Sequence, residues 1–442
     1  MSLIIGQKVQ AEKSKCHYEI KKKLGEGGQG AVFLVEGPTG PMALKWYNQI
    51  HSKPDQRKAI EYLIGEPPPK GLAGKRFIWP QDIATANGTD RFGYLMALIE
   101  TNRFAELGDI WAKKKQAPDY PTLCEISFQI ANSYRALHLS GHCYRDISRG
   151  NVLFDPKTGE VLICDNDNIG IDNQGSCSIW GTWEYIAPEL ITDKSKNPST
   201  KTDWHSLAVF LFNLWMWHHP LHGKMEYEIH TWDLFAKKKV YGASPVFVFD
   251  PFDSCNQLPS QYKTCLKKWD ACPSVIKNLF TKAFTVGLKN PDGRVTEGEW
   301  QEAFLRLKDG AISCQKCKAA CLWESSNINF TCWYCKSPIN LPPKLQISRT
   351  NGTHQILLEK DKQIFQIHLD SKFDKDDSQN IIGQVVQNPT NPNIWGIRNL
   401  SKFNWVATFI DGKTLEIHPQ KAVPMVDGLK LNIGNTEAII KA

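Results

Sequence analysis

The chain has 442 residues, which predicts about two to four domains, and its 22% charged and 41% hydrophobic residues are typical of a soluble globular protein. A net charge of +7 over this length does not favour a nucleic-acid or anionic-membrane partner. The longest apolar run, residues 207–217, is shorter than the ~20 residues of a membrane-spanning helix, and the N-terminus lacks a secretory pattern, so we expect a cytoplasmic protein without a membrane partner.

The first hundred residues predict a small sheet accompanied by one helix. Residues 16–46 alternate apolar and polar side chains around Gly-rich turns, as antiparallel strands do. Residues 54–64 predict a helix, and Asn87 followed by Gly88 favours the tight turn of a further hairpin. We therefore expect a compact first lobe over about residues 14–100.

The following segment, to about residue 310, is predicted to be mostly helical. Residues 121–141 place apolar side chains on one helical face and end at Gly141, a typical helix stop. Two short apolar runs, residues 151–154 and 161–164, predict a pair of strands around the turn DPKTGE. The apolar run noted above predicts a buried helix.

A glycine-rich pattern, LGEGGQGAV, lies in the first lobe. Gly25, Gly27 and Gly30 have the spacing G-x-G-x-x-G, with Gly28 between them and Val32 after them. The spacing alone is weak evidence, because a dinucleotide-binding turn uses it as well. Here it joins two predicted strands, which favours a loop that closes its backbone over phosphate groups.

The next predicted strand carries Lys45, whose ammonium group we expect to hold the α and β phosphates of a nucleotide. In such a site an acid on the following helix orients the lysine. Glu61 is the predicted acid, and Glu66 is the alternative.

Three polar residues further along the chain complete the predicted site. Asp146 lies in the loop YRDISRGN, where a carboxylate accepts the proton of an attacking hydroxyl, and Asn151 follows where it would bind magnesium. Asp165 ends an apolar strand 19 residues after Asp146 and would join a metal to the phosphates. The sequence therefore predicts catalytic roles for Lys45, Asp146, Asn151 and Asp165.

These patterns, in this order and followed by GTWEYIAPE, resemble those of eukaryotic-type Ser/Thr protein kinases over residues 14–309. The resemblance implies an α+β, bilobal kinase fold and an enzyme that uses ATP and Mg²⁺ to phosphorylate Ser or Thr of protein substrates, with autophosphorylation included. It also implies that Glu189 pairs with Arg294 and that Asp203 braces the catalytic loop.

The resemblance further implies a set of nucleotide-binding residues, in which Met96 is the gatekeeper and residues 97–100 bind adenine through their backbone. The set consists of Gly25, Gly27, Gly28, Gly30, Val32, Lys45, Glu61, Met96, Ala97, Ile99, Asn151 and Asp165.

The chain departs from the kinase pattern at supporting positions. Tyr144 stands where the family usually has His, and Ser148 replaces a Lys whose charge Arg149 would supply. Asn166 and Asp167 replace the Phe and Gly that follow the metal-binding Asp. Without that Phe, we do not expect regulation by a flip of this segment.

A regulatory site is predicted from Arg145, which directly precedes Asp146. In kinases such an Arg pairs with a phosphate on the activation segment and orders the loop. Ser176, Ser178 and Thr182 are the candidate positions, and phosphorylation of Ser176 or Ser178 is predicted to raise activity.

The chain has thirteen cysteines, an odd and mostly scattered set that favours a reducing compartment over a disulfide framework. Cys314 and Cys317 form one C-x-x-C unit, and Cys332 and Cys335 form another after fourteen intervening residues. Two such units predict a structural Zn²⁺ held by four thiolates, with a redox pair as the alternative. Cys321 is predicted to lie outside the site.

The C-terminal hundred residues lose helical periodicity, and their short apolar runs at turn-like spacing predict an all-β sandwich. IIGQVV, IRNLS, DGKTLEIHP and VDGLKLNIG resemble a forkhead-associated (FHA) domain in their order. Gln384 follows Gly383 where phosphothreonine-binding members have Arg, so the resemblance implies a degenerate docking module that binds phosphopeptides poorly.

The predicted domains are a kinase domain at 1–310, with lobes at about 14–100 and 101–310, a zinc ribbon at 311–340 and an FHA-like sandwich at 341–442. This architecture resembles that of bacterial kinases in tellurite-resistance-associated stress systems. The resemblance implies two partners, a von Willebrand factor A protein and a metal-dependent protein phosphatase.

The leading interpretation is an ATP- and Mg²⁺-dependent Ser/Thr protein kinase. The alternative is a nucleotide-binding pseudokinase scaffold that assembles partner proteins. Nucleic-acid binding through the zinc ribbon is weaker, because Lys316, Lys318 and Lys336 make only a modest basic surface. A small-molecule kinase is also weaker, because Ala187-Pro188-Glu189, which the resemblance makes the end of the activation segment, favours protein substrates.

Overall fold

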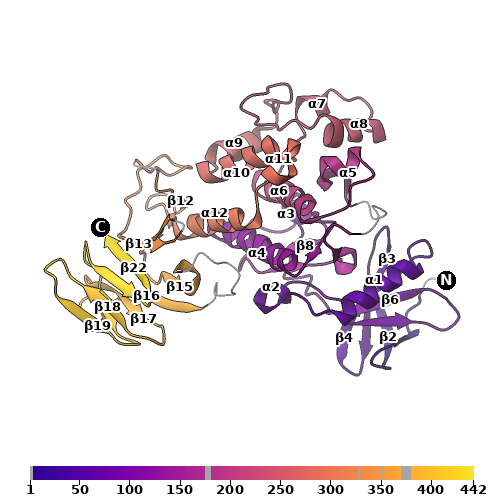
Figure 1. Ribbon diagram of the computed structural model, residues 1–442, viewed down its shortest axis with the longest axis horizontal. Coiled ribbons are helices and arrows are strands. Elements are labelled where there is room, and N and C mark those ends of the chain that lie inside the picture. Colours follow the sequence, from indigo (N-terminus) through magenta and orange to yellow (C-terminus); the bar gives the residue numbers. More distant parts are fainter. Residues whose placement is uncertain (1–2, 175–180, 327–328, 351, 370–379) are drawn as a thin grey trace. The chain divides into compact units, whose positions relative to one another are not determined.

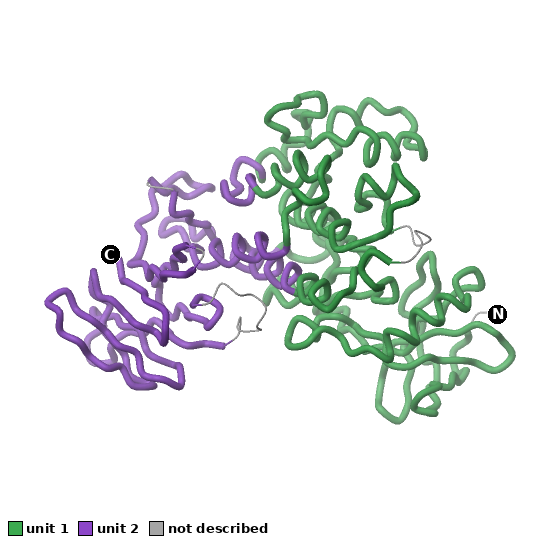
Figure 2. The backbone as a smooth tube through the Cα atoms, viewed as in Figure 1, with its two compact units in different colours: residues 1–117, 133–268, 279–296 green, residues 118–132, 269–278, 297–442 purple. Residues whose placement is uncertain are grey.

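The computed structural model describes residues 3–174, 181–326, 329–350, 352–369 and 380–442. The chain forms two compact units, which Figure 2 shows in different colours. Unit 1 consists of residues 1–117, 133–268 and 279–296, and unit 2 consists of residues 118–132, 269–278 and 297–442.

The N-terminal lobe of unit 1 is a closed antiparallel barrel with the strand order β1-β2-β3-β4-β6-β5. Figure 1 labels four of its strands, β2, β3, β4 and β6, together with α1. Strand β1 lies before the predicted lobe boundary at residue 14, and it closes the barrel by pairing with both β2 and β5. Ile20, Val35 and Trp46 are buried in the barrel core. The elements are β1 (Lys8–Ala11), β2 (His17–Glu26), β3 (Gly30–Gly37), β4 (Gly40–Tyr47), α1 (Pro54–Gly65), α2 (Gly71–Lys75), β5 (Asp82–Thr85) and β6 (Phe92–Met96).

The predicted helix at 54–64 is therefore α1, and the predicted second hairpin is β5 with β6. Gly88 in its turn has φ +78°, the left-handed region that glycine adopts without steric cost. The antiparallel strands expected at 16–46 are β2, β3 and β4.

The C-terminal lobe of unit 1 is mostly helical, as predicted. Gly141 follows α4 with φ +84°, which ends the helix as expected, and the predicted pair of short strands is the antiparallel pair β8 and β9. Residues 207–216 of the apolar run lie in α6 and are all buried, and Trp217 follows the helix as its C-cap.

The elements that follow the barrel are α3 (Leu107–Trp111), α4 (Tyr120–Leu139), β7 (His142–Cys143), β8 (Val152–Phe154), β9 (Val161–Ile163), η1 (Asn166–Asn168), β10 (Gly170–Ile171), η2 (Trp183–Tyr185), α5 (Pro188–Thr192), α6 (Thr200–Met216), α7 (Lys224–Tyr227), α8 (Leu234–Lys238), η3 (Lys239–Ala243), α9 (Lys263–Ala271), α10 (Ser274–Phe284), α11 (Val286–Lys289), η4 (Pro291–Gly293) and α12 (Glu297–Asp309). Among the helices of the described ranges, none has the length and apolar character needed to cross a membrane.

The C-terminal part of unit 2 contains a small hairpin and two larger sheets. The hairpin is β11 with β12, and the two sheets have the strand orders β14-β13-β22-β21-β18-β19 and β15-β16-β17-β20. Buried side chains from both sheets, including Leu345, Val385 and Trp405, form one hydrophobic cluster. The elements are β11 (Ala311–Ser313), β12 (Ala320–Leu322), β13 (Lys344–Arg349), β14 (Gly352–Leu357), β15 (Gln363–Phe365), η5 (Gln366–His368), β16 (Ile381–Gln387), β17 (Trp395–Asn399), β18 (Trp405–Thr408), β19 (Thr414–Ile417), β20 (Ala422–Pro424), β21 (Lys430–Ile433) and β22 (Thr436–Lys441).

Unit 2 begins before the predicted boundary at residue 310, because three helical segments pack within it. The carboxylate of Glu324 accepts hydrogen bonds from the backbone N–H groups of Ser274 and Val275 at the start of α10. Lys308 of α12 pairs with Glu125 of α4. The three-domain division remains a prediction, since contacts group α12 and parts of α4 and α10 with the C-terminal sheets.

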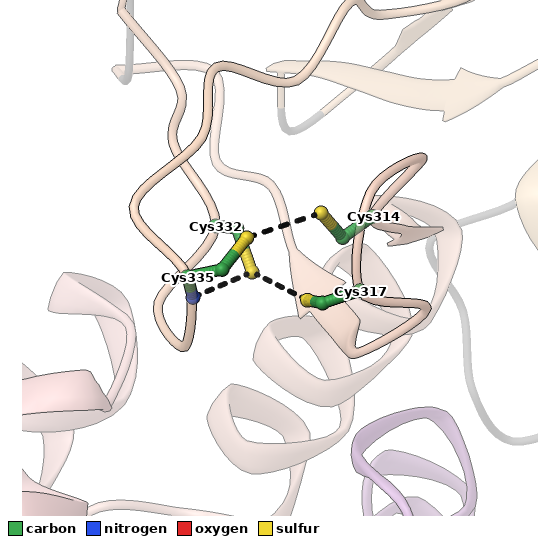
Figure 3. A group of neighbouring side chains, drawn as sticks. All are labelled: Cys314, Cys317, Cys332 and Cys335. Atoms are coloured by element: carbon green, nitrogen blue, oxygen red, sulfur yellow. Dashed lines mark hydrogen bonds between the residues drawn. The ribbon is translucent and has the colours of Figure 1, made fainter.

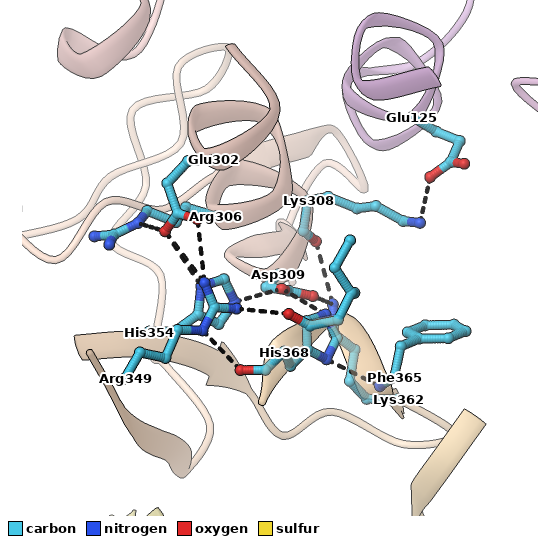
Figure 4. Close-up of polar contacts among 11 residues, drawn as sticks. Glu125, Glu302, Arg306, Lys308, Asp309, Arg349, His354, Lys362, Phe365 and His368 are labelled. Carbon is cyan, nitrogen blue, oxygen red and sulfur yellow. Dashed lines mark hydrogen bonds and ion pairs between the residues drawn. The ribbon is translucent and has the colours of Figure 1, made fainter. Parts of the chain in front are cut away.

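A buried polar cluster joins α12 to the sheets within unit 2 (Figure 4). Oδ2 of Asp309 accepts hydrogen bonds from His354 Nε2 at 2.7 Å and His368 Nε2 at 3.0 Å, and Oδ1 lies 3.4 Å from Lys362 Nζ. His368 Nδ1 accepts from the backbone N–H of Phe365, so its Nε2 carries the proton. The ammonium group beside the carboxylate makes this a hydrogen-bonded ion cluster and disfavours a bound cation.

We expect unit 2 to lose stability as the pH falls from about 6.5 to about 4. Burial lowers the pKa of His368 from 6.5 to about 4. The unfolded chain therefore binds more protons than the folded chain in this window, so acid favours unfolding, by about 3 kcal/mol at most. Urea titrations of the full chain at pH 7 and pH 4.5, read by hydrogen exchange in peptides that span β14, measure the effect.

The control is His368→Gln, which keeps a donor toward Asp309 and does not titrate. Its free energy of unfolding should change less between the two pH values than that of the wild type. Burial would raise the pKa of Asp309, but His368 and Lys362 outweigh it and hold this pKa well below its usual value. Protonation of Asp309 therefore also destabilises unit 2, but only at lower pH. An equal pH dependence of the two proteins would contradict the assignment to His368.

Candidate active site

The glycine-rich loop joins β2 to β3, and its glycines have different physical reasons to be glycine. A Cβ atom at Gly25, Gly27 or Gly28 would meet nothing within 4 Å, so these residues leave the loop backbone open. A Cβ at Gly30 would lie 2.1 Å from the carbonyl oxygen of Trp46, so only glycine lets β3 approach β4 there. Of the predicted phosphate loop, three glycines are therefore free to face a ligand, and the fourth supports the sheet.

Lys45 lies on β4, where its register partner on β3 is Val32. Its ammonium group is almost completely buried and has three polar partners: Asp167 Oδ2 at 2.9 Å, Asp165 Oδ1 at 3.3 Å and Gln29 Oε1 at 2.8 Å. Burial opposes the charged form, but the two carboxylates outweigh it and raise the pKa of Lys45. Lys45 is therefore a fixed cation below the glycine-rich loop.

The predicted partner of Lys45 needs correction. Glu61 lies on α1 with its side chain 49% exposed, and its carboxylate binds Arg57 Nε at 2.9 Å. Arg57 also binds Glu12, so α1 is tied to the segment after β1. Asp167 provides the carboxylate contact that Glu61 was predicted to make, because the turn after Asp165 brings it closer to the lysine.

Asp146 and Asn151 meet in the loop between β7 and β8. Oδ1 of Asp146 accepts hydrogen bonds from the backbone N–H of Thr182 at 3.0 Å and from its hydroxyl at 3.3 Å, and Oδ2 accepts from Asn151 Nδ2 at 3.0 Å. Burial raises the pKa of Asp146, although these hydrogen bonds oppose the shift. A carboxylate with a raised pKa, held in one orientation, suits a proton acceptor.

Asp165 follows β9 in the left-handed region, with φ +50°. Its side chain is 40% exposed, unlike its neighbours in the turn, so it is open to a ligand. Burial raises the pKa of Asp165, and Lys45 opposes the shift. The structure thus brings Lys45 and Asp165 into contact.

Asp203, near the start of α6, braces the catalytic loop as expected. Its carboxylate accepts hydrogen bonds from the backbone N–H groups of Tyr144 at 2.5 Å and Arg145 at 3.0 Å, and His138 Nε2 lies 3.0 Å away. Arg145 has φ +73°, a strained conformation that these bonds hold in place. The hydroxyl of Tyr144 donates to the carbonyl oxygen of Cys164, which links this loop to the strand before Asp165.

The predicted adenine region is lined by an apolar cluster. Met96 at the end of β6 is buried, and Ile99 and Val32 pack against the same cluster, as do Leu162 and Cys164. An apolar wall of this kind suits a flat heteroaromatic ring. Ala97 lies just after β6 and is exposed.

Comparison with known proteins agrees with this geometry. The protein kinase domain family matches residues 18–297. The chain belongs to the protein kinase family. Human ribosomal protein S6 kinase alpha-1 is 28% identical over 227 residues, 50% of this chain and 30% of the relative. Ribosomal protein S6 kinase 2 beta of Xenopus laevis is 28% identical over 234 residues (51% and 36%), and protein kinase C delta type of Rattus norvegicus is 27% identical over 234 residues (50% and 33%). The chain spans about a third of the length of these relatives.

The kinase domain also forms the predicted ion pair between Glu189 and Arg294. Arg294 NH1 and NH2 donate to the two carboxylate oxygens at 2.8 and 2.7 Å, a bidentate arrangement, and the guanidinium also binds the carbonyl oxygens of Gly287 and Lys201. The pair joins the end of the activation segment to the region after α11.

We expect Arg294→Met to destabilise unit 1 by about 3–5 kcal/mol, since it leaves the Glu189 carboxylate without its partner and removes the donors to the carbonyl oxygens of Gly287 and Lys201. Urea unfolding of the full chain measures the loss. Arg103→Met is the matched control, because the Arg103 side chain is 41% exposed and its buried partner Asp155 keeps hydrogen bonds from the backbone N–H groups of Lys157 and Thr158, so we expect a smaller loss, about 1 kcal/mol. Similar losses of unfolding free energy in the two variants would contradict the larger contribution that we assign to the buried Arg294.

Asp167 is a residue in contact with Lys45 that sequence reasoning missed. The kinase pattern marks this position only by a glycine that the chain lacks. Tyr47 lies two residues after Lys45 on β4, so its side chain falls on the same face, and its hydroxyl donates to Asp167 Oδ2. A second acid two residues after Asp165 was the available signal.

The predicted regulatory site is only partly described. Arg145 NH2 binds the carbonyl oxygens of Ile171 at 3.3 Å and Gln174 at 2.9 Å in the activation segment. Ser176 and Ser178 lie outside the described residues, so their phosphorylation remains a prediction. Thr182 is described, and it is hydrogen bonded to Asp146.

The two C-x-x-C units of unit 2 converge (Figure 3). Cys314 Sγ lies 3.7 Å from Cys335 Sγ, and Cys317 Sγ lies 3.6 Å from Cys332 Sγ, with all four sulfurs within 4.8 Å of one another. Four thiolates around a zinc ion at Zn–S distances of about 2.3 Å have sulfurs about 3.8 Å apart. Cys321 lies on β12 and is not one of the four.

Proposed function

We propose that the chain is a serine/threonine protein kinase that transfers the γ-phosphate of ATP to protein substrates. The observation that carries the proposal is the arrangement around Asp146, whose two carboxylate oxygens are oriented by Thr182 and Asn151. This leaves Asp146 fixed beside the segment that would present a substrate hydroxyl. The family relationship supports the same activity.

Each residue then has a distinct role. Lys45 would hold the α and β phosphates, and Asp146 would accept the proton of the attacking hydroxyl. Asn151 and Asp165 would hold Mg²⁺, and their amide and carboxylate oxygens fit a hard cation. When bound, the ion neutralises charge on the phosphates. Gly25, Gly27 and Gly28 would cover the phosphates with backbone.

The test is transfer of labelled phosphate from ATP to an added acceptor protein and to the chain itself. Mass spectrometry would locate modified Ser or Thr residues. The pseudokinase scaffold predicts nucleotide binding with no transfer, so a bound but untransferred γ-phosphate would refute the proposed activity.

The proposal extends to unit 2. Cys314, Cys317, Cys332 and Cys335 would bind one structural Zn²⁺ in a zinc ribbon over 311–340, and the sulfur separations support this. The two sheets with a shared core over 341–442 support an FHA-like sandwich. We assign it a docking role, because Gln384 stands in place of the Arg expected in phosphothreonine-binding members.

The partners and the compartment rest on resemblance and composition. Protein substrates follow from the kinase family. A von Willebrand factor A protein and a metal-dependent protein phosphatase follow only from the domain architecture, and a cytoplasmic location follows from the cysteine pattern.

A further inference from the structure

Lys45 is bound by a carboxylate that the kinase pattern does not supply. Asp167 Oδ1 and Oδ2 lie 3.0 and 2.9 Å from Lys45 Nζ, and the Asp167 side chain is fully buried. At this position the kinase pattern has glycine, which offers no carboxylate. The contact is therefore a property of this chain.

Asp167 is itself held from two other sides. The hydroxyl of Tyr47 donates to its Oδ2, and Nε2 of Gln56 donates to the Tyr47 hydroxyl at 3.1 Å. The same Gln56 group lies 3.5 Å from the backbone carbonyl of Asp167. Asp167 thus belongs to a closed network of side chains from β4, α1 and η1, which restricts it to one orientation.

The two acids of this turn have different environments. Asp165 is partly open to solvent and touches Lys45 with one oxygen at 3.3 Å, whereas Asp167 is enclosed and touches it with both. A carboxylate that binds a metal ion needs an oxygen accessible to the ion, whereas a carboxylate that positions a lysine needs a fixed orientation. The environments therefore favour Asp165 for the metal and Asp167 for the lysine.

We propose that Asp167 is the positioning residue of Lys45, in the role that the kinase pattern gives to an acid on the following helix. The inference rests on the proposed function, because it concerns the same phosphate-binding lysine. It fits the position of Glu61, which binds Arg57 at the surface. Asp165 and Asp167 lie in one turn, so a single segment positions both the metal ligand and the Lys45 ammonium group. Lys45 then needs no ion pair from α1.

The test compares Asp167→Asn with Glu61→Gln in the full chain. Asparagine keeps the shape of Asp167 and removes its charge, so we expect kcat/KM for ATP to fall by about 10- to 100-fold, with weaker ATP binding. Glu61→Gln should change kcat/KM by less than about two-fold, because its partner is a surface arginine. A comparable loss of kcat/KM in Glu61→Gln would overturn the proposal. Faster phosphate transfer in Asp167→Asn would overturn it as well, because it would mean that Asp167 keeps Lys45 from binding the phosphates of ATP.

A double-mutant cycle separates positioning of Lys45 from a general structural role. In a Lys45→Met background, Asp167→Asn should alter ATP affinity by less than about two-fold, because the group it positions is gone. Equal losses of ATP affinity in both backgrounds would refute the assignment. If Asp167→Asn does not fold, Tyr47→Phe carries the test: a loss of about three-fold or more supports the network, and unchanged kinetics overturn it.

ATP affinity is measured without turnover, so the inference and the proposed function can fail separately. A chain that binds ATP through Lys45 and Asp167 but transfers no phosphate refutes the kinase activity and supports the positioning role. A chain that transfers phosphate with full efficiency as Asp167→Asn supports the activity and refutes the positioning role.

Discussion

Removal of zinc is expected to unfold residues 311–340 of the full chain. Apart from the cysteines, the core around the four thiols has few buried side chains, among them Ile312, Trp323 and Ile339, so little apolar burial opposes unfolding there. A structural zinc ion contributes about 10–16 kcal/mol of apparent free energy in small zinc-binding peptides. A strong chelator should therefore raise hydrogen exchange across this segment, and elemental analysis should find one zinc ion per chain before chelation.

Two serine variants sharpen the zinc prediction. Cys332→Ser removes one proposed ligand, so it should lose zinc and show the exchange pattern of the chelated protein. Cys321→Ser is the matched control, because Cys321 is buried nearby on β12 but is not one of the four thiols, and it should retain zinc. Full zinc content in Cys332→Ser, or stable 311–340 peptides without metal, would exclude the structural zinc site.

Asp146→Asn is expected to lower the rate of phosphate transfer by about 10²- to 10⁴-fold, the usual contribution of a positioned proton acceptor. An amide cannot accept the proton of the substrate hydroxyl, yet it is similar in shape and can still accept the hydrogen bond from the backbone of Thr182. ATP affinity should therefore change by less than about three-fold. Initial rates with labelled ATP and direct binding measurements separate the two quantities.

The control for this variant is Asp90→Asn in the exposed turn between β5 and β6, which should transfer phosphate at the wild-type rate. If Asp146→Asn keeps that rate, another group accepts the proton and the proposed role of Asp146 is wrong. If the wild type transfers no phosphate, the scaffold interpretation replaces the kinase.

Two contacts of buried charged residues in unit 1 were predicted correctly from sequence patterns. Asp203 and the Glu189–Arg294 pair were assigned from the kinase resemblance, and both form the expected hydrogen bonds. Each contact involves a buried charged group, Asp203 or Arg294, that would be costly to leave unpaired, so few arrangements satisfy it.

The lysine partner was predicted wrongly because helix position does not fix side-chain direction. Glu61 lies on the helix where the pattern expects an acid, but Arg57 is one turn before it on the same helix face and binds its carboxylate. Sequence spacing could not decide between Arg57 and Lys45 as the partner of Glu61. In the folded chain Asp165, Asp167 and Gln29 bind the Lys45 ammonium group, and these partners come from segments far from α1 in the sequence.

The sequence by itself determined the order of the catalytic patterns, the pairing of cysteines into two units and the alternation that produces the strands, since each depends on residue types at short spacing. Tertiary structure alone decided that β1 closes the barrel, that α12 packs with the C-terminal sheets and that Asp167 reaches Lys45. These contacts join segments far apart in the chain. The local sequence allows many alternative contacts, and the ones that form bury apolar side chains and pair buried charges.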